Sequence, residues 1–315
     1  MSKLTVSVSP HIHDKTTTTL IMLDVIIALI PAFIASILIF GVRAAVVTMV
    51  CISACVFFEW VFEKITKRPN TISDLTAIIT GILLAFNLPV TIPLWQAVLG
   101  SAVAIILVKQ LFGGLGKNFA NPAITARIVL FLAFSVTMTN WDSPYDSTNL
   151  WVYPIDGVAG ATPLALMWRG ETEYLPSMLQ MFLGIRGGSL GETSNLALLM
   201  GGVYLIARKV ITWHIPVIYI GVVVVLTALL GENAIYHMFA GGLFLGAIFM
   251  ATDYVTSPQT KKGKLIFAVG AGLFTVLFRI YSSYPEGVSF AILIMNILTP
   301  YINKYTQSVP LGRKK

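Results

Sequence analysis

Runs of about 20 apolar residues, separated by short polar segments, fill most of this sequence and limit the folds open to it. An α-helix rises about 1.5 Å per residue, so one such run spans the roughly 30 Å hydrocarbon core of a bilayer. The runs do not alternate between apolar and polar residues as barrel strands do, and an open sheet leaves backbone groups unsatisfied in lipid. We therefore predict an all-α polytopic membrane protein.

The composition agrees with this class. Only 11% of the residues are charged and 56% are hydrophobic, whereas soluble domains carry roughly 25% charged residues. The net charge of +7 comes from Lys and Arg residues that lie between the apolar runs, where the positive-inside rule and anionic lipid headgroups account for them. The sequence therefore does not indicate nucleic-acid binding.

The apolar windows predict about ten transmembrane helices. These cover residues 20–41, 43–62, 75–93, 94–112, 121–138, 193–208, 211–230, 234–252, 264–281 and 287–304. The predicted organisation is a cytoplasmic N-terminal segment (1–19), a first five-helix repeat (20–138), an external loop (139–192), a second five-helix repeat (193–304) and a cytoplasmic tail (305–315). No signal peptide of the usual form precedes the first run.

The distribution of basic residues predicts the orientation. With the N-terminus inside, all but four of the 21 Lys and Arg residues fall on the cytoplasmic side, counting Lys109, Arg127 and Lys264 as snorkelling from inner span ends. The four exceptions are Arg43, Arg169, Arg186 and Arg279. We therefore predict that both termini are cytoplasmic and that the 139–192 loop lies outside.

This loop is too long for a simple connection, and long loops are usually functional. Its apolar pieces at 163–168 and 174–185 predict short helices that lie on the membrane or dip into it. An external loop without a function is the alternative.

A faint internal match relates the two halves at an offset of 165 residues. Four residues near span three recur near span eight, namely Gly81, Val90, Thr91 and Pro93 as Gly246, Val255, Thr256 and Pro258. An odd number of spans separates them, so the repeats are predicted to be inverted. Inverted repeats with Pro- and Gly-interrupted spans are typical of transporters, which makes a non-redox solute channel or transporter one alternative function. Chance agreement between apolar segments is the other interpretation.

Ionisable residues inside spans are candidates for function. Asp24, Glu59, Asp74 and Asp253 lie toward the predicted cytoplasmic ends of spans. Asp74 could cap the third span. Asp24 lies a full turn inside its run, where it either pairs with Arg127 or belongs to a cation pathway.

The stretch LFGGLGKNFANPAITARI (111–128) concentrates polar groups in a glycine-rich turn. Lys117, Asn118 and Asn121 supply donors and acceptors next to Pro122, which suits the first turn of a helix. Such a turn could hold a planar heterocycle or an anion at the helix N-terminus. A tight turn capped by Asn is the structural alternative.

The two cysteines, Cys51 and Cys55, form neither a disulfide framework nor a metal-binding set. They are predicted to be packing residues or to share in a cluster completed by another subunit. No metal site and no motif for hydrolysis or ATP-driven transport is predicted.

The segment DGVAGATP (156–163) is a small-residue turn that ends in Thr162 beside Gly160 and Ala161. It resembles the flavinylation signature D-G-x-(S/T)-G-A-(S/T), in which a flavin transferase attaches FMN to the final hydroxyl through a phosphoester. Ala159 departs from the signature at its fourth position.

The resemblance extends over the full length, through SPHIHDKTTTTLIMLDVIIALIPA, SDLTAIITGILLAFNLP, GGLGKNFANPA and GVSFAILIMNILTPYI. The chain resembles the family of Rnf complex D subunits, which belong to ferredoxin:NAD oxidoreductases that move sodium ions or protons. The related B subunit of the sodium-translocating NADH:quinone reductase shares these motifs but usually has a longer N-terminal extension, so the Rnf type is favoured over a quinone-reductase type.

This resemblance implies that Thr162 carries covalent FMN and that Asp156, Gly160 and Ala161 serve recognition by the transferase. It also implies that the turn carrying Lys117, Asn118 and Asn121 contacts a second, non-covalent flavin such as riboflavin.

The implied function is electron transfer in the bacterial inner membrane, coupled to ion transport. The implied partners are the other membrane and peripheral subunits, including a second flavinylated subunit and iron–sulfur subunits, and the flavin transferase during maturation. Because the chain has no dinucleotide fingerprint and no cluster ligands of its own, it is predicted to be an enzyme subunit that is incomplete alone.

Overall fold

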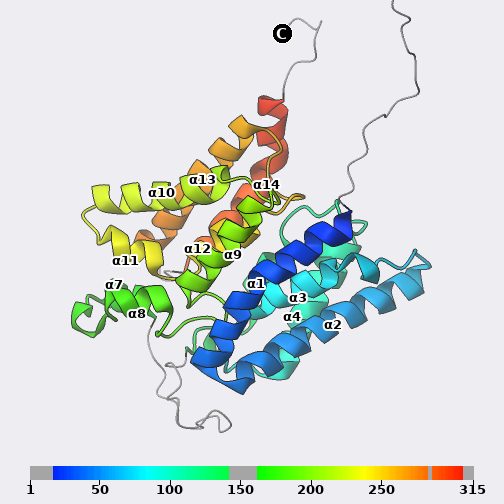
Figure 1. Ribbon diagram of the computed structural model, residues 1–315, viewed down its shortest axis with the longest axis horizontal. Coiled ribbons are helices and arrows are strands. Elements are labelled where there is room, and N and C mark those ends of the chain that lie inside the picture. Colours follow the sequence, from blue (N-terminus) through cyan, green and yellow to red (C-terminus); the bar gives the residue numbers. More distant parts are fainter. Residues whose placement is uncertain (1–16, 142–161, 283–285, 308–315) are drawn as a thin grey trace, which may run out of the picture.

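The computed structural model describes residues 17–141, 162–282 and 286–307, and every regular element in these ranges is a helix. The helices form two groups that meet along α1 (Thr18–Phe40) and α9 (Asn195–Ala207), which lie side by side (Figure 1). The all-α prediction is confirmed for the described residues.

The first group continues from α1 with helices of very different length. They are α2 (Val42–Thr66), α3 (Thr76–Phe86), α4 (Leu94–Ala102) with its π-helical continuation (Val103–Gln110), α5 (Pro122–Ala133) and α6 (Ser135–Met138). A short 3-10 turn, Ile72–Asp74, precedes α3.

The second group follows α9. It contains α10 (His214–Leu229), α11 (Ala234–Phe239), α12 (Leu243–Leu245) with its π-helical continuation (Gly246–Met250), α13 (Lys261–Tyr281) and α14 (Val288–Thr306). Between the groups lie α7 (Pro163–Arg169), the 3-10 turn Thr172–Tyr174 and α8 (Met178–Leu183). The short helices predicted at 163–168 and 174–185 are thus present in the described part of the loop.

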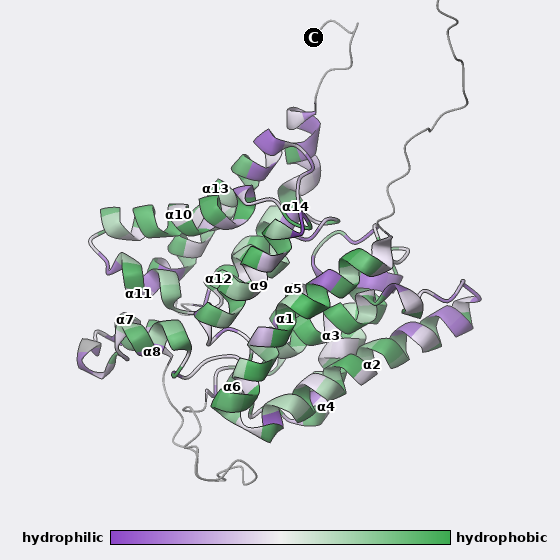
Figure 2. Ribbon diagram, in the orientation of Figure 1, coloured by the Kyte–Doolittle hydropathy of each residue, from purple (hydrophilic) through white to green (hydrophobic). Residues whose placement is uncertain are grey.

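Among the described residues, three helices, α1, α2 and α13, are long and apolar enough to cross a membrane, and five shorter apolar helices accompany them. Large apolar side chains such as Leu38, Leu132 and Leu229 are exposed on the helix surfaces. Figure 2 shows apolar residues along most helices and hydrophilic residues mainly near the helix ends and connections. A hydrocarbon solvent explains this exposure, so the fold is that of a helical membrane protein.

Predicted spans three and eight are not continuous helices. Helix α3 has 11 residues, a length of about 16 Å, and ends before Pro89, which disfavours a helical conformation in Leu88. Span eight is interrupted between α11 and α12, where Gly241 adopts a positive φ of 64°. The predicted spans 75–93 and 234–252 are thus each interrupted, and the count of about ten spans stays a prediction.

The interrupted helices form the centre of the molecule. All residues of α3 except Ile78, and all five residues of the π-helical segment after α12, are buried. Non-continuous helix is tolerated at membrane depth where protein surrounds it or where it lines a cavity. Cys51 and Cys55 are free and buried nearby, which agrees with packing roles.

Candidate functional site

Thr162 is the N-cap of α7, and Pro163 occupies the first turn of that helix. The Thr162 Oγ1 accepts a hydrogen bond of 3.3 Å from the Ala165 backbone N–H. Only 4% of the residue is exposed, so its hydroxyl is oriented by the helix start and enclosed by protein. Asp156, Gly160 and Ala161 lie outside the described residues.

Thr162 opens on a small cavity, which we call the Thr162 pocket. Its lining residues come from the start of α7, the loop before α9, the break between α11 and α12, and the start of the α14 segment. They are Thr162, Pro163, Arg186, Gly187, Gly188, Glu192, Thr193, Gly241 and Glu286.

Arg127 of α5 connects the acidic residues of this pocket. Its guanidinium lies 3.3 Å from Glu192 Oε1 and 3.0 Å from Glu286 Oε2. It also donates to Ser289 Oγ at 2.6 Å and to Asn87 Oδ1 at 3.4 Å. Arg127 is buried, so the prediction that it snorkels from an inner span end was wrong.

Arg186 and Arg279 are the other buried cations of this region. Arg186 donates to the Glu192 backbone carbonyl at 3.0 Å, and Arg279 donates to the backbone carbonyls of His237 and, at 2.8 Å, Ala240. The Nε of each arginine has no hydrogen-bond partner among the described residues. The pocket therefore has unused donor capacity for an anion.

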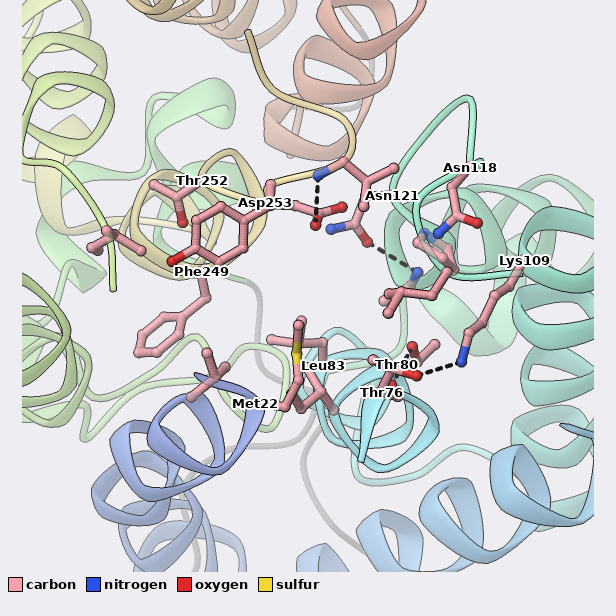
Figure 3. Close-up of a pocket in the computed structure, with 18 of the residues that line it drawn as sticks. Met22, Thr76, Thr80, Leu83, Lys109, Asn118, Asn121, Phe249, Thr252 and Asp253 are labelled. Carbon is pink, nitrogen blue, oxygen red and sulfur yellow. Dashed lines mark hydrogen bonds between the residues drawn. The ribbon is translucent and has the colours of Figure 1, made fainter. Parts of the chain in front are cut away.

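A second cavity, the central pocket, lies between the two helix groups (Figure 3). It holds about 800 Å³, including its open mouth. Figure 3 shows Asn118 and Lys109 on one side and Phe249 and Thr252 on the other. Met22, Thr76, Thr80, Leu83, Asn121 and Asp253 also line it.

Of the three polar residues singled out in the glycine-rich turn, Asn118 and Asn121 line the central pocket and Lys117 does not. Asn121 caps α5, its Oδ1 accepting from the N–H groups of Ala123 at 3.1 Å and Ile124 at 3.3 Å. Asn118 faces the pocket region with a buried Oδ1 that has no partner among the described residues. Lys117 is exposed and is not among the lining residues. The cavity thus combines apolar walls with the polar residues Asn118 and Asn121, which suits a planar heterocycle.

Lys109 is buried beside this pocket. Its Nζ lies 2.7 Å from Glu59 Oε1 and donates to Thr76 Oγ1 at 2.6 Å. The prediction that Lys109 snorkels was wrong, because a carboxylate inside the helix bundle compensates its charge.

Asp24 pairs with a different arginine from the one that the sequence suggested. Its Oδ2 lies 3.2 Å from Arg208 NH2, and its Oδ1 accepts from the Tyr204 hydroxyl at 2.8 Å. The proposed Asp24–Arg127 pair is therefore wrong, since Arg127 contacts Glu192 and Glu286. The role of Asp24 or Arg127 in a cation pathway stays a prediction.

Asp74 accepts a hydrogen bond of 2.9 Å from the Thr76 N–H at the start of α3, but the N-cap residue of that helix is Leu75 and not Asp74. Sequence reasoning placed Arg186 and Arg279 only by topology and missed the charged cluster around the Thr162 pocket. The sequence did contain a signal for this cluster: ionisable residues recur at or near the apolar runs, and ionisable residues inside spans are candidates for function.

The whole chain is related to known membrane subunits. The model of the NQR2, RnfD, RnfE family matches residues 5–312. The D subunit of the Na(+)-translocating ferredoxin:NAD(+) oxidoreductase complex of Acetobacterium woodii is 47% identical over 314 residues, covering 99% of this chain and 96% of the relative.

Two further relatives extend the comparison. The D subunit of the proton-translocating ferredoxin:NAD(+) oxidoreductase complex of Clostridium ljungdahlii is 42% identical, covering 99% of this chain and 97% of the relative. The D subunit of the ion-translocating oxidoreductase complex of Escherichia fergusonii is 36% identical, with 98% of each chain covered. Since the match spans nearly the entire chain, the protein belongs to the NQR2, RnfD, RnfE family.

Proposed function

We propose that this chain acts as the D-type membrane subunit of an ion-translocating ferredoxin:NAD oxidoreductase and carries covalent FMN on Thr162. The observation that carries the proposal is the position of Thr162, a signature threonine whose hydroxyl borders a cavity with free arginine donors. The full-length relatives, which are named as D subunits of such complexes, support the same assignment.

The protein's own residues would define the environment of the attached group. The α7 N-cap geometry orients the Thr162 oxygen, and the enclosure of the residue limits access of water. Gly187, Gly188 and Gly241 leave space at the pocket wall, because they carry no side chains. FMN, when bound, supplies one- and two-electron transfer, while the protein supplies position and electrostatics.

The central pocket is our proposed site for a second, non-covalent flavin such as riboflavin. Its apolar walls with a few polar groups, among them Asn118 and Asn121, are the combination typical of small-molecule sites. Asn118 Oδ1 would accept a hydrogen bond from the ring, and Asn121 would hold the turn in place by capping α5.

Coupling to ion transport is energetically reasonable for a subunit of this kind. Moving one charge through 100 mV of membrane potential is worth about 2.3 kcal/mol. We propose that the transported ion is sodium or a proton, since the relatives include a sodium-translocating and a proton-translocating complex. The remaining steps of the reaction require partner subunits with iron–sulfur and further flavin groups, in the cytoplasmic membrane of a bacterium.

The proposal is tested by co-expressing the chain with a flavin transferase and measuring intact mass and in-gel flavin fluorescence after denaturation. We expect the wild type to gain the mass of one FMN phosphoester. Thr162→Val should abolish the fluorescence because the acceptor hydroxyl is gone, and Thr162→Ser should retain it. An unmodified wild-type Thr162 would rule out the redox assignment.

The second flavin is tested by counting the flavin released on denaturation of the purified complex. Asn118→Leu should lower the released flavin at least several-fold, because it removes the unpartnered amide oxygen. Lys117→Leu is the matched control, since Lys117 is exposed and does not line the pocket. Equal flavin release from the two variants would contradict this site.

A further inference from the structure

Arg186 and Arg279 lie at and just behind the wall of the Thr162 pocket. Arg186 is itself a lining residue. Arg279 lies behind the wall formed by Gly241, because a Cβ added to that glycine would be 3.4 Å from Arg279 NH2. Each arginine is only 3% exposed, so both charges are removed from water.

The charges around the pocket do not balance. Three buried arginines and two glutamates meet there, and both glutamates pair with Arg127. Among the described residues, no carboxylate oxygen lies within 4.0 Å of the Arg186 or Arg279 guanidinium. Backbone carbonyls are their hydrogen-bond acceptors, and the Nε of each stays unpartnered.

Among the described residues, three buried guanidinium groups share two carboxylates, and an excess of buried positive charge is unfavourable. An anion placed between the two arginines would relieve this cost, and phosphate oxygens match the planar donor geometry of arginine. The pocket opens on the hydroxyl to which we assign a phosphoester, and a phosphodiester carries one negative charge.

We propose that Arg186 and Arg279 form the phosphate-binding cradle that holds the phosphodiester linking FMN to Thr162. This inference rests on the proposed function. The two residues are positioning residues: they neutralise the linkage and fix its direction, and they require no contact with the flavin ring. The unmodified protein is consequently less stable, because its cradle holds uncompensated positive charge.

The test is a thermodynamic cycle measured by melting temperature in detergent. Protein made with and without the flavin transferase is compared for the wild type, Arg186→Met and Arg279→Met. We expect flavinylation to raise the wild-type melting temperature by roughly 5 °C. In either methionine variant the gain should fall to less than half, because the charge that the phosphate compensates is gone.

Arg169→Met is the matched control, since Arg169 lies on the same helix as Thr162 but is exposed and does not line the pocket. Its flavin-dependent gain should equal that of the wild type. If a methionine variant fails to fold or to accept FMN, Arg186→Lys and Arg279→Lys are measured instead. A retained gain in the lysine variants supports the cradle, and an absent gain refutes it.

Intact mass distinguishes failure of the proposed FMN attachment from failure of the proposed arginine cradle. Absence of FMN from the wild type refutes the proposed function. Attached FMN with equal gains in the wild type and the Arg186 and Arg279 variants refutes only the cradle. Attached FMN with no gain in the wild type also refutes it, because another anion would then already neutralise the arginines.

Discussion

Lys109 and Glu59 form an ion pair that is 2% and 0% exposed, at the border of the central pocket. Thr71 and Gln110 also donate to the Glu59 carboxylate, at 2.9 and 3.1 Å, so both oxygens and the ammonium are satisfied. Such a pair adds little net stability over apolar residues, but loss of one member leaves an unpaired charge in low dielectric.

At the scale of this residue pair we expect Glu59→Gln to lower the free energy of unfolding by about 3–5 kcal/mol. The double variant Glu59→Leu/Lys109→Leu should lose less than Glu59→Gln alone, since it removes both charges. Denaturant unfolding in mixed micelles measures both.

The pair of Asp24 and Arg208 provides the control, because the Arg208 side chain is 59% exposed and only Asp24, at 13%, is mostly covered. Arg208→Gln should change stability little, since solvent screens that pair. If Glu59→Gln lowers the free energy of unfolding no more than Arg208→Gln does, the buried Lys109–Glu59 pair is not important for stability.

At the level of helices, α1 and α9 pack against each other where the two helix groups meet (Figure 1). Gly201 of α9 makes the close approach possible, because a Cβ there would overlap the Ala28 carbonyl oxygen of α1 and lie 2.9 Å from Phe249. Small residues commonly allow such backbone contact between membrane helices.

We therefore predict that Gly201→Ala pushes α1 and α9 apart and lowers the free energy of unfolding by about 1–3 kcal/mol, as overpacking does. Gly221→Ala in α10 is the control, since a Cβ at Gly221 meets no atom within 4 Å. It should leave stability unchanged or raise it slightly. If the two variants have the same free energy of unfolding, the α1–α9 contact accommodates the added methyl group without loss of stability.

For the whole molecule, the two groups repeat a similar order of helices. In the first group, α2 is followed by the buried helix α3 and then by α4 and α5; in the second, α10 and the short α11 are followed by the buried α12 with its π-helical continuation and then by α13 and α14. This order is compatible with two repeats. The inverted relation, the count of about ten spans and the sidedness stay predictions.

Sidedness is tested by labelling intact cells with an impermeant thiol reagent, in a chain with Cys51 and Cys55 replaced by Ala. The positive-inside rule predicts that Glu173→Cys, exposed in the loop between α7 and α8, reacts from outside. Lys64→Cys, exposed at the end of α2, should react only after the membrane is opened. The reverse pattern would invert the topology and the proposed location of FMN.

The sequence by itself determined the all-helical class of the described residues and the short helices of the loop. These features follow from local causes: apolar run length, helix-start chemistry at Thr162 and Asn121, and the need to satisfy backbone groups in lipid. The family resemblance was also readable, because its motifs extend along the full chain.

Only the tertiary structure decided how the buried charges pair. Arg127 meets Glu192 and Glu286 rather than Asp24, Lys109 meets Glu59 rather than solvent, and Arg186 and Arg279 converge near Thr162. In a low-dielectric interior, a charge is tolerated only beside the partner that helix packing brings to it. That partner can lie more than a hundred residues away, so local sequence patterns do not specify it.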